Sequence, residues 1–200
     1  MLRTALPLAA ACLAFAGCNS QSNEPAPENG DDKTASRTPP VPEPSGFAST
    51  YTDLELAKCE VLEENREEGS WARYRCPGFG DIPLLVQEGD GRFDLDAGID
   101  DDDFQTLGAF NDIGDTVEWR LDAGKPFAVI FRFIDVAGET PDRTVLAVET
   151  VGREGALGCR LAQLSGDTPD ANQRARDAAD AAAADGFACP EEPEFTGNAR

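Results

Sequence analysis

The stretch Thr116–Val136, with the sequence TVEWRLDAGKPFAVIFRFIDV, decides the predicted fold. Two runs rich in β-branched and aromatic residues, 116–121 and 127–136, flank a short segment with a glycine, 122–125, which is typical of a β-hairpin. The second run is apolar on nearly both faces, so we expect a central strand that is covered twice. The apolar side chains expected to share one face are Val117, Trp119, Leu121, Phe127, Val129 and Phe131.

Further hairpins are expected on either side of this stretch, because alternating or apolar runs are separated there by turn residues. The paired runs are 51–62 with 71–76, 82–87 with 92–95, and 143–151 with 157–164.

One helix is expected near the C-terminal end. Thr168-Pro169-Asp170 has the composition of a helix start, with a hydroxyl side chain as N-cap and proline at the first helical position. Alanines then recur at helical spacing until Gly186, which is expected to end the helix. The sequence therefore predicts an α+β fold, an antiparallel sheet of about seven or eight strands with one C-terminal helix packed on it.

A basic residue and a short apolar run lie at the N-terminus. Arg3 precedes an apolar run, 5–15, that is too short to span a bilayer and is typical of a signal peptide over 1–17. Phe15-Ala16-Gly17-Cys18 resembles the lipobox of bacterial lipoproteins, in which cleavage precedes the cysteine and that cysteine is acylated. Cleavage at Ala14-Phe15-Ala16, which would give a soluble secreted protein, is the alternative. We expect the lipoprotein form, with Cys18 as the lipidated residue.

Composition divides the rest of the chain into three parts. Residues 18–46 are rich in proline and small polar side chains and are predicted to be a disordered linker. Residues 47–191 are long enough to bury one core and are predicted to be a single globular domain. Residues 192–200 are predicted to be a flexible tail.

The cysteine count supports both the lipoprotein reading and a disulfide framework. The chain has six cysteines. Cleavage after Ala16 would leave five, whereas cleavage before Cys18 with acylation leaves four that can pair in an oxidising compartment. Four cysteines allow three pairings. The two bridges that we favour are Cys59–Cys76 and Cys159–Cys189.

Charge and the lack of histidine exclude several function classes. With 38 acidic and 17 basic residues the net charge is −21, which disfavours nucleic acids and anionic headgroups. The chain has no histidine, which removes the usual zinc and copper sites and the Ser-His and Cys-His nucleophile pairs. Catalysis would have to rest mainly on carboxylates, so we expect no enzyme, no catalytic residue and no cofactor.

A candidate ligand site is formed by Arg120, Arg132 and Glu118. They are expected on the less apolar face of the central hairpin, where arginines could hold a carboxylate, a phosphate or a sugar. The alternative, which we favour, is that the arginines pair with cross-strand acids or snorkel beneath the helix.

The acidic run Asp96–Asp103, preceded by Asp94, offers the clustered carboxylate oxygens that Ca²⁺ prefers. Its spacing departs from an EF-hand loop, because Gly98 stands where the fifth ligand would be and no glutamate follows at the right distance. We therefore expect a solvated acidic loop and assign no metal site.

A second set of residues is spread over 51–189. It consists of Trp71 with Cys76-Pro77-Gly78, Glu118-Trp119-Arg120, Cys159, Asp170-Ala171-Asn172, Ala175-Arg176, Ala178 and Asp180. In this pattern the segment resembles a family of uncharacterised secreted proteobacterial proteins. The resemblance implies a single domain and carries no activity.

Together these features predict a lipid-anchored, periplasm-facing binding or interaction module. Its expected partner is a basic protein or a cell-wall component, and no nucleic acid is expected. The alternatives are a carboxylate-dependent hydrolase, or an inhibitor of a basic envelope enzyme such as lysozyme.

Overall fold

The computed structural model describes residues 46–137 and 143–200. The predictions for the signal peptide, for Cys18 and for the linker up to residue 45 lie outside these ranges. Within them, no helix is both long enough and apolar enough to cross a membrane. The elements are β1 (Phe47–Asp53), the short 3-10 helix η1 (Leu56–Lys58), β2 (Glu60–Asn65), β3 (Trp71–Phe79), β4 (Ile82–Gly89), β5 (Arg92–Ala97), β6 (Asn111–Ile113), β7 (Thr116–Asp122), β8 (Lys125–Asp135), β9 (Thr144–Thr150), β10 (Arg160–Ser165), α1 (Ala171–Ala184) and β11 (Glu194–Thr196).

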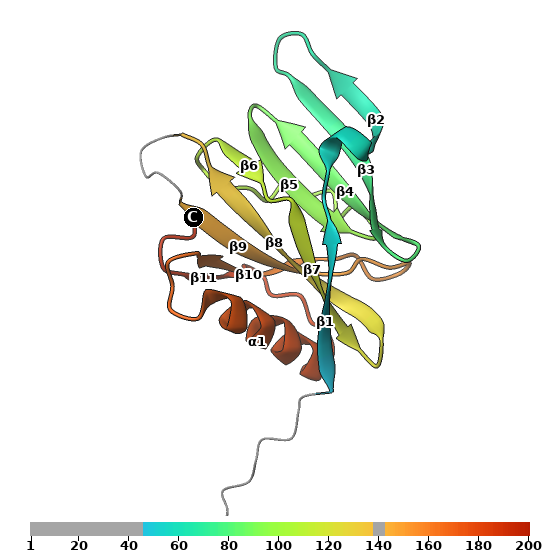
Figure 1. Ribbon diagram of the computed structural model, residues 1–200, viewed down its shortest axis with the longest axis vertical. Coiled ribbons are helices and arrows are strands. Elements are labelled where there is room, and N and C mark those ends of the chain that lie inside the picture. The colour runs from blue at the N-terminus through green and yellow to red at the C-terminus, as the bar shows by residue number, and fades with distance from the viewer. Residues whose placement is uncertain (1–45, 138–142) are drawn as a thin grey trace, which may run out of the picture. The chain divides into compact units, whose positions relative to one another are not determined.

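The strands form two sheets, and the helix adds a third layer. The seven-stranded sheet has the order β1-β7-β8-β9-β10-β11, with β6 also paired to β8, and the four-stranded sheet has the order β2-β3-β4-β5. One hydrophobic core lies between the sheets, and a second lies between the seven-stranded sheet and α1 (Figure 1). The predicted α+β class with one helix packed on a sheet is confirmed. The structure adds the division into two sheets and a parallel pair, β10 with β11.

Strand β8 is central and covered on both faces, as its apolar sequence predicts. It pairs with β7 on one side and with β9 on the other. Val129, Phe131 and Phe133 enter the core between the sheets, while Ala128 and Ile130 pack towards the helix. Phe127, expected on the first of these faces, packs on the helix side. A bulge opposite Arg120 and Leu121 makes it an extra residue in β8 and shifts the alternation.

The segment 51–62 was predicted to be one strand, and this is wrong. It belongs to two strands in different sheets, because β1 pairs with β7 whereas β2 pairs with β3. The chain crosses between the sheets at buried Leu54 and through η1. Apolar residues continue through this crossing, so the sequence pattern does not mark it.

Helix α1 packs through small side chains on the seven-stranded sheet. Its buried residues are Ala171, Ala175 and Ala179, which belong to the predicted stripe. Gly186 has a φ of +80° and follows the helix end as predicted. The start differs, because Asp170 rather than Thr168 is the N-cap, with a left-handed φ of +58° and no capping bond from its side chain. The Thr168 carbonyl accepts the Ala171 N–H, so the predicted cap residues form a turn before the helix.

Both predicted disulfides are confirmed. Cys59–Cys76 joins the start of β2 to β3, and Cys159–Cys189 joins the segment before β10 to the chain after α1. Disulfides persist in oxidising compartments, so the two bridges indicate an extracytoplasmic protein.

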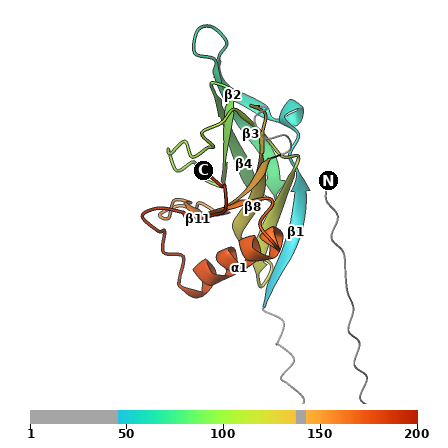
Figure 2. The same ribbon diagram turned by 90° about the vertical axis from the view of Figure 1, so that its left-hand side faces the viewer.

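The last residues belong to the fold, in contrast to the flexible tail expected over 192–200. Strand β11 pairs with β10, and Ala199 is fully buried in the core between the sheets. Figure 2 shows β11 beside the C-terminal end and above helix α1. A pairing of only three residues gives too short a pattern to be seen in the sequence.

Candidate functional site

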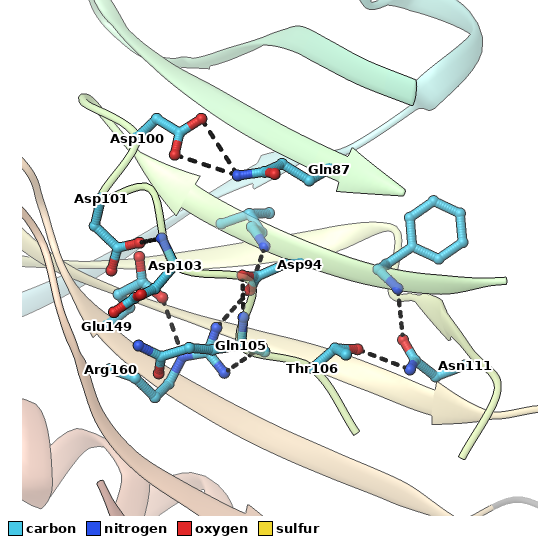
Figure 3. A network of polar contacts seen from close by, with 12 residues as sticks. Gln87, Asp94, Asp100, Asp101, Asp103, Gln105, Thr106, Asn111, Glu149 and Arg160 are labelled. Atoms are coloured by element: carbon cyan, nitrogen blue, oxygen red, sulfur yellow. Dashed lines mark hydrogen bonds and ion pairs between the residues drawn. The ribbon is translucent and has the colours of Figure 1, made fainter. Parts of the chain in front are cut away.

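A buried arginine, Arg160, is the centre of a cluster of charged side chains inside the domain. It lies on β10 and is 2% exposed. Its Nη2 donates to Asp94 at 2.7 Å, its Nε donates to Glu149 at 3.0 Å, and its Nη1 donates to the Gln105 carbonyl at 3.1 Å (Figure 3). The guanidinium also lies 5.2 Å from the centre of the Phe131 ring. Arg160 therefore links both sheets and the loop that carries Gln105.

Three carboxylates meet beside Arg160. One oxygen from each of Asp96, Asp101 and Glu149 lies within 4.8 Å of the others, and we call these three residues the carboxylate triad. Asp96 lies on β5 and Glu149 on β9, whereas Asp101 lies in the β5–β6 loop, residues 98–110. Figure 3 shows Asp101 reaching from this loop towards Glu149.

Two oxygens of the triad are buried without a hydrogen-bond partner among the residues that the structure describes, Asp96 Oδ2 and Glu149 Oε1. Burial, together with the charge of Glu149, raises the pKa of Asp96. Burial also raises the pKa of Glu149, against the opposing effect of Arg160. Asp94 and Glu149 are paired with Arg160, while Asp96 and Asp101 form no ion pair with a described residue. The cluster therefore contains more carboxylates than basic groups, and either bound protons or a bound cation would balance the excess negative charge.

The acidic run was expected to be a solvated loop, and for its first residues this is wrong. Asp94 and Asp96 are each 2% exposed, because both lie on β5 and face the interior. Asp102 and Asp103 are exposed, as expected. Strand β5 ends at Ala97, so Asp94 and Asp96 belong to a buried strand whereas Asp102 and Asp103 belong to the loop that follows it.

The β5–β6 loop is fixed at both ends. Gly98 has a φ of +87°, and a Cβ there would lie 2.3 Å from the Gly152 carbonyl oxygen, so only glycine fits. Near the other end, Asn111 accepts the Phe93 N–H at 3.1 Å and donates to the Thr106 hydroxyl at 2.9 Å (Figure 3). The residues between Gly98 and Thr106, which include Asp101, are therefore anchored on both sides.

The same loop forms one wall of an open cleft of about 1110 Å³. The other walls are the β2–β3 and β4–β5 turns, β10, and the chain from residue 193 onward. Trp71 and Phe104 are 37% and 44% exposed. A Cβ on Gly89 would lie only 3.7 Å from the Phe104 ring, so the turn packs directly beneath that ring. The aromatic rings of the cleft belong to Trp71, Phe104 and Phe195.

The charged side chains of the cleft are two arginines and one aspartate. Arg92 contacts Asp90 at 2.8 Å and lies 4.8 Å from the centre of the Phe110 ring. Arg200 lies 4.0 Å from the centre of the Phe195 ring. The Arg92 guanidinium donates to Asp90 and to the Gly108 carbonyl, whereas Arg200 is held over a ring by a cation–π contact.

The predicted ligand residues Glu118, Arg120 and Arg132 lie together under helix α1, away from this cleft. Glu118 and Arg120 are buried. Both arginines lie beneath the helix, but Arg120 pairs with Asp180 of the helix rather than with a cross-strand acid, and Arg132 donates to Thr144 and Asn172. A ligand role for these residues stays a prediction. Their partners on the helix are Arg176 for Glu118, Asp180 for Arg120 and Asn172 for Arg132.

These ion pairs are expected to stabilise the docking of the helix. Asp180→Asn is expected to lower the free energy of unfolding by about 2 kcal/mol, because Arg120 loses a charge-assisted pair at 2.6 Å in a buried setting. Urea denaturation measures the difference. Asp177→Asn, an exposed change of the same kind on α1, should cost less than about 0.5 kcal/mol. Equal effects of the two substitutions would contradict this role of Asp180.

The sequence analysis missed Arg160 and Glu149, although a signal for them existed. Glu149 is the single charged residue in 144–151 and Arg160 is the single charged residue in 157–164, two largely apolar parts of the last predicted hairpin. The two are cross-strand partners in the structure. Opposite charges facing one another within an apolar hairpin indicate a buried ion pair.

Comparison with known proteins adds no family, since no family model, curated protein or solved structure matches the chain.

Proposed function

We propose that this protein is an envelope-tethered binding module that holds a cell-wall glycan in the cleft over Trp71, Phe104 and Phe195. The observation that carries the proposal is a pair of exposed aromatic rings, Trp71 and Phe104, in one open cleft, beside the half-buried Phe195 and two arginines. Sugar rings present apolar C–H faces to aromatic rings and hydroxyl groups to planar polar side chains. An open cleft also suits a polymer, because a long ligand extends beyond the part that is bound.

The charge of the cleft supports a neutral or acidic ligand over a basic one. Its charged lining side chains are Asp90, Arg92 and Arg200, which sum to +1, whereas the whole chain carries −21. A basic protein would be attracted to the rest of the surface more than to this cleft. Glycans with carboxylate substituents, as in peptidoglycan, suit the Arg200 guanidinium, since Arg92 is paired with Asp90.

The placement of the carboxylates supports binding over hydrolysis. Glycoside hydrolysis uses a pair of carboxylates on either side of the scissile bond. Among the described residues that line the cleft, Asp90 is the single acid, and it is paired with Arg92. The converging carboxylates of the triad lie in the interior instead.

The tether is part of the proposal. The disulfides indicate an extracytoplasmic protein, and the sequence before Cys18 resembles a lipobox. Acylation of Cys18 would attach the domain to a membrane through the linker, within reach of the cell wall. Metabolic labelling with a palmitate analogue should mark the wild-type protein and not Cys18→Ala; equal labelling of both would contradict acylation at this residue.

Co-sedimentation with purified peptidoglycan tests the binding function. Trp71→Ala is expected to weaken binding about tenfold or more, because a central aromatic contact is lost. Leu157→Ala is the matched control, since Leu157 is 56% exposed and lies outside the cleft. Circular dichroism should show both variants folded. No sedimentation of the wild type, or the same loss in both variants, would contradict the proposal.

A further inference from the structure

We propose that the carboxylate triad, Asp96, Asp101 and Glu149, is a Ca²⁺ site that fixes the β5–β6 loop to the two sheets. The proposal goes beyond the binding function above, because the ion would lie outside the cleft. It also reverses the expectation, drawn from spacing along the chain, that the acidic run holds no metal.

The geometry matches the ligand shell of Ca²⁺. One oxygen from each carboxylate lies within 4.8 Å of the others. Oxygens within this limit of one another can bind one Ca²⁺ at about 2.3–2.6 Å, and Ca²⁺ accepts an irregular shell, whereas Mg²⁺ demands near-ideal octahedral geometry and gives up its waters reluctantly. Carboxylate oxygens are hard ligands, which disfavours zinc and copper.

The unpartnered oxygens are a second observation that points to a cation. Asp96 Oδ2 and Glu149 Oε1 are buried, and no N–H or hydroxyl group of another described residue donates to them. Without an ion, the alternative is a proton shared between the two carboxyl groups, in which Asp96 donates to Glu149. The other oxygen of Glu149 accepts from Arg160. A buried carboxylate oxygen without a donor is costly, and a bound ion satisfies two of them at once.

Asp101 is the third protein ligand, and it lies where an ion could enter the site from solvent. It is partly exposed, whereas Asp96 and Glu149 are buried, so the site opens towards solvent on the loop side. Water can supply the remaining ligands there, as in many Ca²⁺ sites. Asp101 Oδ1 accepts the Asp103 N–H at 2.8 Å, which orients the carboxylate.

The three proposed ligands come from parts of the chain that are far apart in the sequence. Asp96, Asp101 and Glu149 belong to β5, the β5–β6 loop and β9. An ion bound by all three would fix the loop against both sheets. Phe104 of the same loop lines the cleft, so the ion would also fix one cleft wall.

Isothermal titration of the EDTA-treated protein with CaCl₂ tests the proposal. We expect one Ca²⁺ per chain with a dissociation constant of about 10–100 µM, between sensor sites and weak extracellular sites. Asp101→Asn is expected to weaken binding at least tenfold, and MgCl₂ should bind more weakly than CaCl₂. Asp101 is chosen because it is the least buried of the three ligands, so its substitution should leave the fold intact.

Asp102→Asn is the matched control. It makes the same change of charge one residue away, outside the triad, and asparagine tolerates the left-handed φ of +67° found there. We expect less than a twofold change in its affinity. The absence of binding at millimolar Ca²⁺, or equal losses in the two variants, would overturn the proposal. The titration contains no glycan, so its failure is separate from a failure of the cleft proposal.

Discussion

Arg160→Met is expected to lower the free energy of unfolding by about 3–5 kcal/mol. The substitution removes the guanidinium that contacts Asp94 at 2.7 Å and Glu149 at 3.0 Å, and leaves both carboxylates buried without a counter-charge. Each of the three side chains is at most 3% exposed, so water cannot replace the lost partner. Urea denaturation in EDTA, monitored by circular dichroism, measures the effect.

A compensated variant separates the charge effect from packing. Arg160→Met combined with Asp94→Asn and Glu149→Gln removes the uncompensated charges with almost no change in side-chain volume. We expect it to recover more than half of the loss. If the triple variant is as unstable as Arg160→Met alone, contacts of Arg160 with Phe131 and Phe133 dominate, and the account of Arg160 as a charge partner is wrong.

Removal of the Cys159–Cys189 disulfide is expected to cost about 3–4 kcal/mol. The bridge spans a sequence separation of 30 residues, and its loss frees the unfolded chain to sample more conformations. It also ties the chain after α1 to the start of β10, next to the core under the helix. The double substitution Cys159→Ala and Cys189→Ala, compared with wild type by urea denaturation, measures the cost.

The Cys59–Cys76 disulfide gives a comparison within the same protein for the cost of removing Cys159–Cys189. Cys59–Cys76 closes a shorter segment, with a separation of 17 residues, and its removal should cost about 3 kcal/mol on the same reasoning. Free-thiol titration confirms that the remaining bridge is intact in each double variant. A cost below about 1 kcal/mol for Cys159–Cys189 would contradict the stabilising role given to it.

Local patterns in the sequence were enough to predict most of the fold. The hairpin of β7 and β8 follows from two apolar runs around a turn, and the alanine stripe of α1 follows from helical spacing. Both disulfides follow from the placement of cysteines on neighbouring predicted elements. In each case the interacting residues are close in sequence or lie on elements that are adjacent in it.

The functional features depend on contacts that such patterns do not contain. Arg160 and Asp94 are 66 residues apart, and their pair exists because the two sheets stack. The cleft combines turns of one sheet with β11 of the other, and a strand as short as β11 leaves no pattern. Glu118 and Arg120 were noticed because they are charges in an apolar hairpin, the same signal that Glu149 and Arg160 carry.

The central claim is that a cell-wall glycan lies against Trp71, and tryptophan fluorescence tests it most directly. The chain has two tryptophans; Trp71 lines the cleft, and Trp119 is fully buried between the sheets. Titration with soluble disaccharide-peptide fragments of peptidoglycan is expected to shift the emission of the wild type to shorter wavelength, in a saturable way. Trp71→Phe, in which only Trp119 emits, should show no shift. The same shift in Trp71→Phe, or an unchanged wild-type spectrum at millimolar fragment, would contradict the claim.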